Sequence, residues 1–313
     1  MREFVIAQKD DGRRLEKWLQ SAAPGLTTGL LRKYVRLRRV RINGKPAREG
    51  AVLGAGDVLQ VYLNDELFEE KTRENKLLAG FRHHIDVAYE DGNILIVDKR
   101  PGMRAHADGE EKVDTLVTHI QAYLYQKGES NENFVPALCN RIDRFTGGLV
   151  IAAKNREALV CMDRLIRNRE VKKFYLCAAA GRIPREQGAL KGYLLKEGKR
   201  VRVLEKSAPG AQSAETLYRV LSYENGVSLV ECELVTGRTH QIRAQFAAAG
   251  HPLIGDTQYG DPAINARYPV HFQQLYAYRI AFAFTSDAGI LSDLNGKSVR
   301  VKTLHRGFSQ IRL

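Results

Sequence analysis

Continuous apolar stretches recur along the chain after residue 84 and predict buried β-strands. One covers residues 94–99 and another residues 149–153, and both contain the β-branched residues that favour strands. Alternating apolar and polar positions at 214–221 and 228–234 predict two further strands, separated by an Asn225-Gly226 turn. Weaker strand patterns cover 86–93, where the strand is followed by a turn, and 172–179. Many strands with few helices between them indicate an α+β fold on a mainly antiparallel, mixed sheet.

Helical spacing of apolar residues interrupts these strands in three places. It predicts helices over 111–126, 155–169 and 239–250, the last capped by Thr239 and stopped at Gly250. Residues 128–133 are polar and predict a loop. Residues 180–212 are rich in glycine and lysine, so the sequence predicts short strands at best there.

The first 62 residues have a different pattern and predict a small separate α/β domain. Amphipathic helices are expected to begin near Arg13 and near Thr27 or Thr28, either of which can cap the second helix. A strand from Val40 leads into an Asn-Gly hairpin turn, and an alternating strand ends at Tyr62. Residues 63–80 are charged, without a strand period, and we interpret them as a linker to a larger domain at 81–313.

The charge of the chain indicates a polyanionic partner. The formal net charge is +13 over 313 residues, with a pI of about 9.6. Residues 1–50 contain 13 lysines and arginines against 5 aspartates and glutamates, so much of the excess lies there. The four cysteines are far apart and form no C-x-x-C pair, which argues against a zinc site and fits a reduced cytoplasm. We expect a monomer. We expect no secretion signal, because the N-terminus lacks an apolar segment followed by a cleavage site, and no membrane span, because no run of about 18 apolar residues occurs.

A charged loop at 140–146 leads directly into the apolar strand near residue 150. Asp143 lies there between Arg141 and Arg144, and strand-like alternation puts Arg141 and Asp143 on one face. Two glycines follow and permit tight backbone geometry. Taken alone, such a segment is more often a surface turn with a solvated ion pair than a catalytic site.

The wider pattern resembles the RluA-type pseudouridine synthases. Residues 140–154 resemble the central motif of that family, with Asn140 in place of a histidine and Gly147 in place of a serine. Residues 236–256 contain the T-G-R-x-H-Q-I-R and G-H-P-x-x-G-D motifs, and the family's K-x-Y strand ends at Tyr175. A similar opening, E-D-G-N followed by an apolar strand and a lysine, begins at Glu90. The resemblance covers about residues 85–285.

The resemblance implies a set of site residues. Asp143 is the expected catalytic carboxylate, acting as nucleophile or general base, with Arg243 as its partner and Tyr175 stacking on the target base. Expected to bind the substrate are Arg141, Arg144, Arg238, Thr239, His240, Gln241 and Ile242. Arg141 would fill the space that the flipped nucleotide leaves, and Ile242 would contact the other face of the base. No nucleotide-binding loop or ligand cluster occurs, so we expect no cofactor and no metal.

The N-terminal segment resembles the αL RNA-binding module first named for a small-subunit ribosomal protein. Its expected RNA-binding residues are Arg32, Lys33, Arg36, Arg41, Asn43 and Lys45. The sequence therefore predicts isomerisation of uridine in structured RNA. The resemblance favours large-subunit ribosomal RNA over transfer RNA as the substrate. Two alternatives remain at this point: an RNA-binding or ribosome-assembly protein without catalysis, and a glycosidase or phosphate-ester hydrolase. The hydrolase lacks a convincing second carboxylate.

Overall fold

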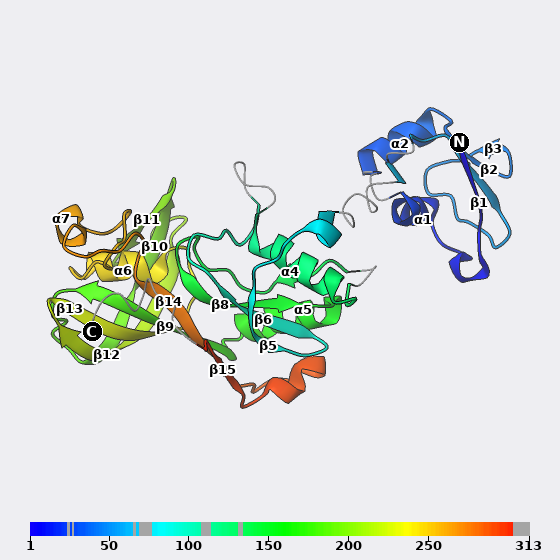
Figure 1. Ribbon diagram of the computed structural model, residues 1–313. Helices are drawn as coiled ribbons and strands as arrows, with labels where there is room; N and C mark the ends of the chain where they lie inside the picture. Colours follow the sequence, from blue (N-terminus) through cyan, green and yellow to red (C-terminus); the bar gives the residue numbers. More distant parts are fainter. Residues whose placement is uncertain are drawn as a thin grey trace. The chain divides into compact units, whose positions relative to one another are not determined.

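The computed structural model describes residues 1–23, 26, 28–64, 67–68, 77–107, 114–130 and 134–302. The chain divides into two compact units, Met1–Phe81 and Arg82–Leu313 (Figure 1). Most of the predicted linker at 63–80 lies outside the described residues, as does Thr27, one of the two proposed caps. Leu63 and Phe68, within that predicted linker, are buried in the core of the first unit.

The first unit combines two helices with a small sheet. Its elements are β1 (Arg2–Val5), η1 (Gln8–Asp10), α1 (Leu15–Ala22), α2 (Thr28–Arg36), β2 (Val40–Ile42), β3 (Lys45–Pro46) and β4 (Val58–Val61). The strands in its described residues pair in the order β1-β4-β2-β3. The predicted Asn-Gly hairpin is confirmed: Asn43 and Gly44 have φ of 51° and 78°, the positive values that a tight hairpin turn requires. Leu15 and Leu31 from the two helices pack against Leu59 of the sheet.

The second unit is built on a large mixed sheet. Its strands are β5 (Asp86–Glu90), β6 (Ile94–Lys99), β7 (Ala137–Leu138), β8 (Gly147–Ala153), β9 (Val171–Ala180), β10 (Gln187–Glu197), β11 (Arg200–Leu204), β12 (Gln212–Glu224), β13 (Val227–Leu234), β14 (Leu275–Phe282) and β15 (Ser298–Arg300). The main path through the described strands runs β11-β10-β12-β13-β9-β14-β8-β6-β5. Within that part of the chain β14 and β8 form the one parallel pair, and the other pairs are antiparallel. The predicted α+β class is therefore confirmed.

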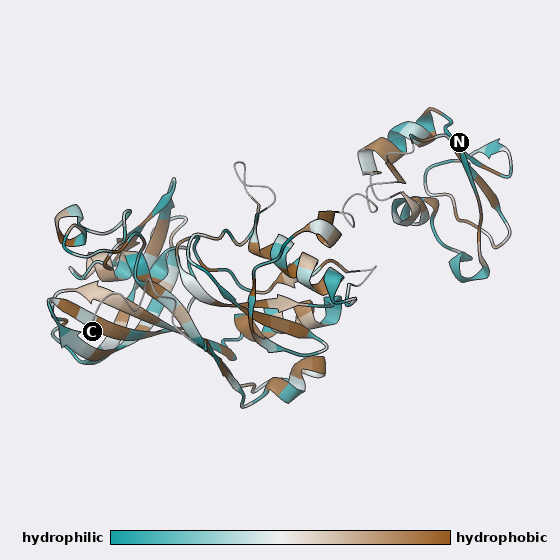
Figure 2. Ribbon diagram, viewed as in Figure 1, coloured by the Kyte–Doolittle hydropathy of each residue, from teal (hydrophilic) through white to brown (hydrophobic). Residues whose placement is uncertain are grey.

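Helices pack on both faces of this sheet. They are α4 (Leu116–Gln126), α5 (Arg156–Arg167), α6 (Gln241–Ala248), α7 (Pro262–Asn265) and the 3₁₀ helix η2 (Gly289–Leu294). Leu95 and Val97 of β6 belong to the layer with α4 and α6, whereas Ile94 and Ile96 belong to the layer with α5 and η2. Strands buried on both faces read as continuous apolar runs, and β6 and β8 are largely brown in Figure 2.

The predicted helices of the second unit are observed with shifted ends. The helix expected at 111–126 appears as α4. Residues 111–113 of that expected helix and residues 131–133 of the predicted loop lie outside the described part of the chain. Asn155 caps α5 by accepting a hydrogen bond from the Ala158 N–H at 2.8 Å. Among the described helices, none is both long enough and apolar enough to cross a membrane.

The prediction of short strands at best for residues 180–212 is wrong. β10 and β11 form a long antiparallel hairpin, and β10 also pairs with β12. The glycines that weakened the strand pattern have a packing role. A Cβ at Gly188 would lie 2.9 Å from the Tyr218 hydroxyl, and one at Gly192 would lie 2.9 Å from the Leu204 carbonyl oxygen. Glycine thus permits close cross-strand approach here.

Candidate active site

The loop between β7 and β8 forms the turn that presents Asp143. The Thr146 N–H donates to the Asp143 carbonyl oxygen at 3.1 Å and closes the turn. The Gly102 N–H, from the loop after β6, donates to the Arg144 carbonyl oxygen at 2.9 Å. This geometry is irregular, not strand-like, with Ile142 buried and its neighbours more exposed. The turn is therefore fixed through its backbone, which leaves the Asp143 side chain free to act.

Lys99 at the end of β6 holds the same turn from inside the protein. Its side chain is 1% exposed, and Nζ donates to the carbonyl oxygens of Arg100, Met103 and Arg144 at 3.1, 2.9 and 2.9 Å. Burial lowers the pKa of Lys99 to about 7, against the opposing effect of the Asp143 and Asp98 carboxylates. Lys99 is the lysine of the motif that begins at Glu90, but no function was assigned to it from the sequence. A lysine that ends a continuous apolar strand was the available sign.

Arg243 of α6 joins Asp143 to a second, buried carboxylate. Its Nη1 donates to Asp143 Oδ2 at 2.8 Å, while Nε and Nη2 donate to Asp256 at 2.7 and 3.0 Å. Asp256 is fully buried. Burial raises the pKa of Asp256, but the bond and charge of Arg243, with the N–H groups of Tyr259 and Gln258, bring it below its ordinary value. The two-pronged bond to Asp256 fixes the plane of the guanidinium and so aims Nη1 at Asp143.

His240 precedes α6 and reaches Asp143 from the same side. It has a left-handed backbone, φ 53°, and is the N-cap of α6, so the predicted cap at Thr239 is wrong. Its Nδ1 lies 2.9 Å from the Tyr259 hydroxyl and its Nε2 lies 3.8 Å from Asp143 Oδ2. Burial lowers the pKa of His240, and Asp143 opposes that change. Burial therefore favours the neutral imidazole beside the carboxylate.

Gln241 uses its amide to attach α6 to the sheet. Nε2 donates to the Glu215 carbonyl oxygen at 3.0 Å and to Thr216 Oγ1 at 2.9 Å. Oε1 accepts from Thr236 Oγ1 at 2.8 Å and from the Arg238 N–H at 3.0 Å. With four hydrogen bonds inside the fold, this amide positions the helix that carries Arg243 and has little capacity left for a ligand.

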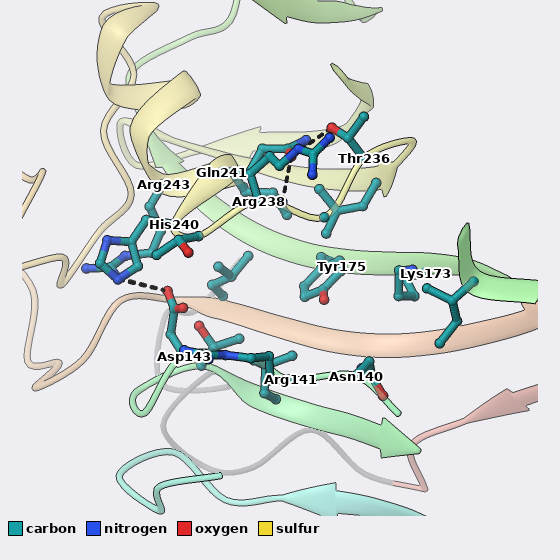
Figure 3. A pocket seen from close by; sticks show the side chains of 18 of the residues that line it. Asn140, Arg141, Asp143, Lys173, Tyr175, Thr236, Arg238, His240, Gln241 and Arg243 are labelled. Carbon is teal, nitrogen blue, oxygen red and sulfur yellow. Dashed lines mark hydrogen bonds and ion pairs between the residues drawn. The ribbon is translucent and has the colours of Figure 1, made fainter. Parts of the chain in front are cut away.

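A cavity of about 540 Å³ lies above β9 and β14, with Asp143 and His240 at one end and Lys173 toward the other (Figure 3). Nine of the expected site residues line it: Arg141, Asp143, Tyr175, Arg238, Thr239, His240, Gln241, Ile242 and Arg243. Tyr175 is 5% exposed, and burial together with the Asp143 charge raises the pKa of its hydroxyl. The hydroxyl is therefore protonated at neutral pH.

Arg144 is the expected site residue that does not line the cavity. Its Nε donates to the Gly102 carbonyl oxygen at 3.0 Å, and its guanidinium carbon lies 5.0 Å from the centre of the Phe145 ring. Three other cations, unassigned by sequence reasoning, do line the cavity: Arg167, Arg169 and Lys173. Burial lowers the pKa of Lys173. The turn from α5 into β9 brings these three residues to the cavity. Lys173 belongs to the K-x-Y motif, whereas no motif contains Arg167 or Arg169.

The expected RNA-binding residues of the first unit are all at its surface. Arg32, Lys33 and Arg36 are exposed on α2, and Arg41 and Lys45 are exposed in the hairpin. Asn43 differs, because its amide donates to Asp57 Oδ1 and accepts from the Val58 N–H, each at 2.8 Å. Asn43 therefore stabilises the hairpin turn with both ends of its side chain.

The two departures from the family motif have local explanations. Asn140 Oδ1 accepts the Ile151 N–H at 2.8 Å and so satisfies a backbone donor of β8. At Gly147 a Cβ would lie 2.3 Å from the ring of Tyr276, which is 1% exposed and donates its hydroxyl to Asp98 at 2.5 Å. The tyrosine ring thus occupies the space where a serine side chain would stand. Neither departure alters the contacts of Asp143.

In the residues that the structure describes, no cluster of histidine, cysteine, aspartate and glutamate is arranged to hold a metal ion.

The comparisons with known proteins agree with the motifs. Residues 93–248 match the family described as RNA pseudouridylate synthase. A ribosomal large subunit pseudouridine synthase C from Vibrio parahaemolyticus is 30% identical over 270 residues, which cover 84% of this chain and 82% of the relative.

Two further comparisons concern relatives of other kinds. The mitochondrial tRNA pseudouridine(32) synthase of Saccharomyces cerevisiae is 30% identical over 218 residues, 65% of this chain and 46% of that protein. The structure of the human RNA pseudouridylate synthase domain containing 4 protein has a TM-score of 0.57 at 20% identity, over 77% of this chain and 95% of that one.

Fold, motifs and cavity together define an isomerase that acts on RNA. The chain belongs to the RluA-type family of RNA pseudouridine synthases.

Proposed function

We propose that Asp143 is the catalytic carboxylate of this RNA pseudouridine synthase and that its substrate is large-subunit ribosomal RNA. The observation that supports the first part is the state of the two Asp143 oxygens. Arg243 binds Oδ2 at 2.8 Å, whereas Oδ1 makes no hydrogen bond or ion pair with any described residue. One oxygen is thus oriented by the protein, and the other is available to a ligand in the cavity.

The reaction needs one anionic group and no oxidant. The bond from C1′ to N1 of uridine breaks, a bond from C1′ to C5 forms, and C5 loses a proton while N1 gains one. Asp143 acts as nucleophile or as general base beside C1′. Among the described residues that line the cavity, Asp143 is the one carboxylate, which disfavours hydrolysis by a carboxylate pair.

The walls of the cavity suit a detached uracil. The Tyr175 ring of β9 offers a flat apolar surface, and Ile242 at the start of α6 is also buried in the same lining. We assign stacking on the base to Tyr175 and contact with the other face to Ile242. Because its hydroxyl is protonated, Tyr175 can donate a proton but does not serve as a base in its resting state.

Support for ribosomal RNA comes from the relatives. The similarity to a ribosomal large subunit pseudouridine synthase C covers most of both chains, whereas the similarity to a tRNA synthase covers less than half of that protein.

We further propose that the first unit binds RNA through α2 and its hairpin. The four cysteines are free thiols, which suits the reducing cytoplasm that we propose as its location.

Pseudouridine mapping tests the choice of substrate. In cells that lack this protein, we expect one or a few uridines of large-subunit ribosomal RNA to lose the bulky adduct that carbodiimide forms at pseudouridine. The adducts should return with the wild-type gene and stay absent with an Asp143→Asn gene. Loss confined to transfer RNA would overturn the assignment to ribosomal RNA while leaving the activity itself intact.

Charge removal on α2 tests the proposed RNA-binding unit. Changing Arg32, Lys33 and Arg36 together to glutamine should weaken binding to long RNA and make the slope of log affinity against log salt shallower. Each lost phosphate contact reduces that slope by about 0.7–0.9. A matched variant removes three charges elsewhere in the unit, at the exposed Lys9, Lys17 and Arg48. Equal slopes for the two variants would show that α2 makes no specific contact.

A further inference from the structure

Two aromatic rings stack on each other beside the active-site turn, outside the cavity. Phe145 follows Asp143 by two residues, and Phe272 lies just before β14. Their ring centres are 4.7 Å apart and their planes differ by 13°. The Phe272 side chain is 37% exposed, and the His271 ring lies 6.5 Å from it. With the exposed Arg144 guanidinium over Phe145, these four residues form a surface that we call the aromatic shelf.

The shelf is held by the same elements that form the site. Gln273 Nε2 donates to Thr146 Oγ1 at 3.3 Å and so connects the segment of Phe272 to the turn of Asp143. The Gln274 N–H donates to the Ile254 carbonyl oxygen at 2.8 Å. At Gly255 a Cβ would lie 2.2 Å from the Phe272 carbonyl oxygen. The segment that carries Phe272 is thus packed against the loop of Asp256, and the ring is placed before any ligand binds.

The turn presents different chemistry on its two sides. Asp143 and Thr146 line the cavity, whereas Arg144 and Phe145 do not. When a uridine leaves its stack to enter the cavity, the next base in the strand loses a stacking partner. A partly exposed phenylalanine beside an arginine offers a replacement, because every base has a face that stacks on an aromatic ring or a guanidinium. The net charge of +13 favours the same polyanionic ligand.

We propose that the aromatic shelf is a stacking site for a nucleobase adjacent to the target uridine in the RNA. This site lies outside the cavity and rests on the RNA-modifying activity of the family, not on the choice of ribosomal RNA. Its occupant is a base of the single-stranded segment that delivers the uridine. The shelf selects for the presence of a flat base and not for its identity, because the exposed ring of Phe272 carries no polar group that could read the edge of a base.

The test compares two RNAs of equal charge in binding experiments with the full chain. One is a twelve-nucleotide uridine oligomer. The other has the same length and one central uridine, with abasic ribose at all the remaining positions. The ratio of their dissociation constants, measured by fluorescence anisotropy, gives the preference for flanking bases. Phe272→Leu should reduce that preference by about tenfold. Phe272→Trp should keep it, because tryptophan supplies a larger flat ring.

Tyr223 supplies the matched control. It is also 37% exposed, and the Arg182 guanidinium carbon lies 4.4 Å from its ring centre, but it is on β12 and does not line the cavity. Tyr223→Leu should leave the preference unchanged. Equal weakening of both RNAs by Phe272→Leu would mean that the ring only supports the fold, and this would overturn the proposal. So would an unchanged preference, or an equal loss in the Tyr223 variant. Melting temperatures of all variants identify any general loss of structure.

Discussion

Asp143→Asn is expected to abolish the release of tritium from RNA labelled at carbon 5 of uridine, with a fall of about four orders of magnitude or more. The substitution keeps the shape of the side chain, and the single amide oxygen Oδ1 can still accept the hydrogen bond from Arg243, but the negative charge is removed. RNA affinity and thermal stability should stay close to those of the wild type. Single-turnover tritium release with enzyme in excess measures the chemical step directly.

A carboxylate that pairs with arginine outside the cavity provides the control for this variant. Asp86 on β5 lies 3.3 Å from Arg100 in an exposed ion pair, with about half of each side chain accessible. Asp86→Asn should keep full activity, since exposed ion pairs contribute little. Appreciable turnover by purified Asp143→Asn would remove Asp143 from the catalytic role and require another group in the cavity.

Arg243→Met is expected to lose both stability and activity, through two different carboxylates. Asp256 is fully buried and would lose its oppositely charged partner, and breaking a buried ion pair in this way destabilises a protein by about 3–5 kcal/mol. Asp143 would lose the group that orients it. Urea unfolding and single-turnover rates measure the two effects separately. The double variant Arg243→Met with Asp256→Asn removes the unpaired charge, so it should regain stability but not activity.

The same pair predicts how this loss depends on pH. In the wild type the pKa of Asp256 is held below its ordinary value of 3.8, so its contribution to stability is complete above that pH and disappears as pH falls through the lower value. Without Arg243, burial is the largest remaining influence and raises the pKa of Asp256. The variant should therefore gain stability relative to wild type on acidification, and the difference between them should be largest near neutral pH. A constant difference from pH 4 to 8 would contradict this account.

The features that sequence reasoning found are those written in local patterns. Continuous apolar runs located β6 and β8, and Asn43-Gly44 located a hairpin whose turn needs two positive φ values. The resemblance to a family supplied the pairing of Asp143 with Arg243, which the structure places at 2.8 Å. Their chemical roles remain predictions, since geometry alone does not measure a rate.

The features that it missed depend on contacts between distant parts of the chain. Gly188 and Gly192 weakened the strand pattern, although each gives space to a neighbouring strand. The stacking of Phe145 on Phe272 exists only because β14 enters beside the turn, and no periodicity encodes that contact. Lys99 was visible as a charged residue in an apolar context, but its three carbonyl partners become neighbours only when the loop after β6 folds against the turn.

The position of β14 also determines when the site can exist. β8 and β9 follow each other in the sequence, yet β14 lies between them in the sheet. The turn of Asp143 and the ring of Tyr175 therefore reach their final separation only after residues 275–282 have inserted. A growing polypeptide that has already exposed every family motif still lacks a cavity. During synthesis the cavity therefore cannot form before residues 275–282 have left the ribosome, because β14 separates the two strands that bear its walls.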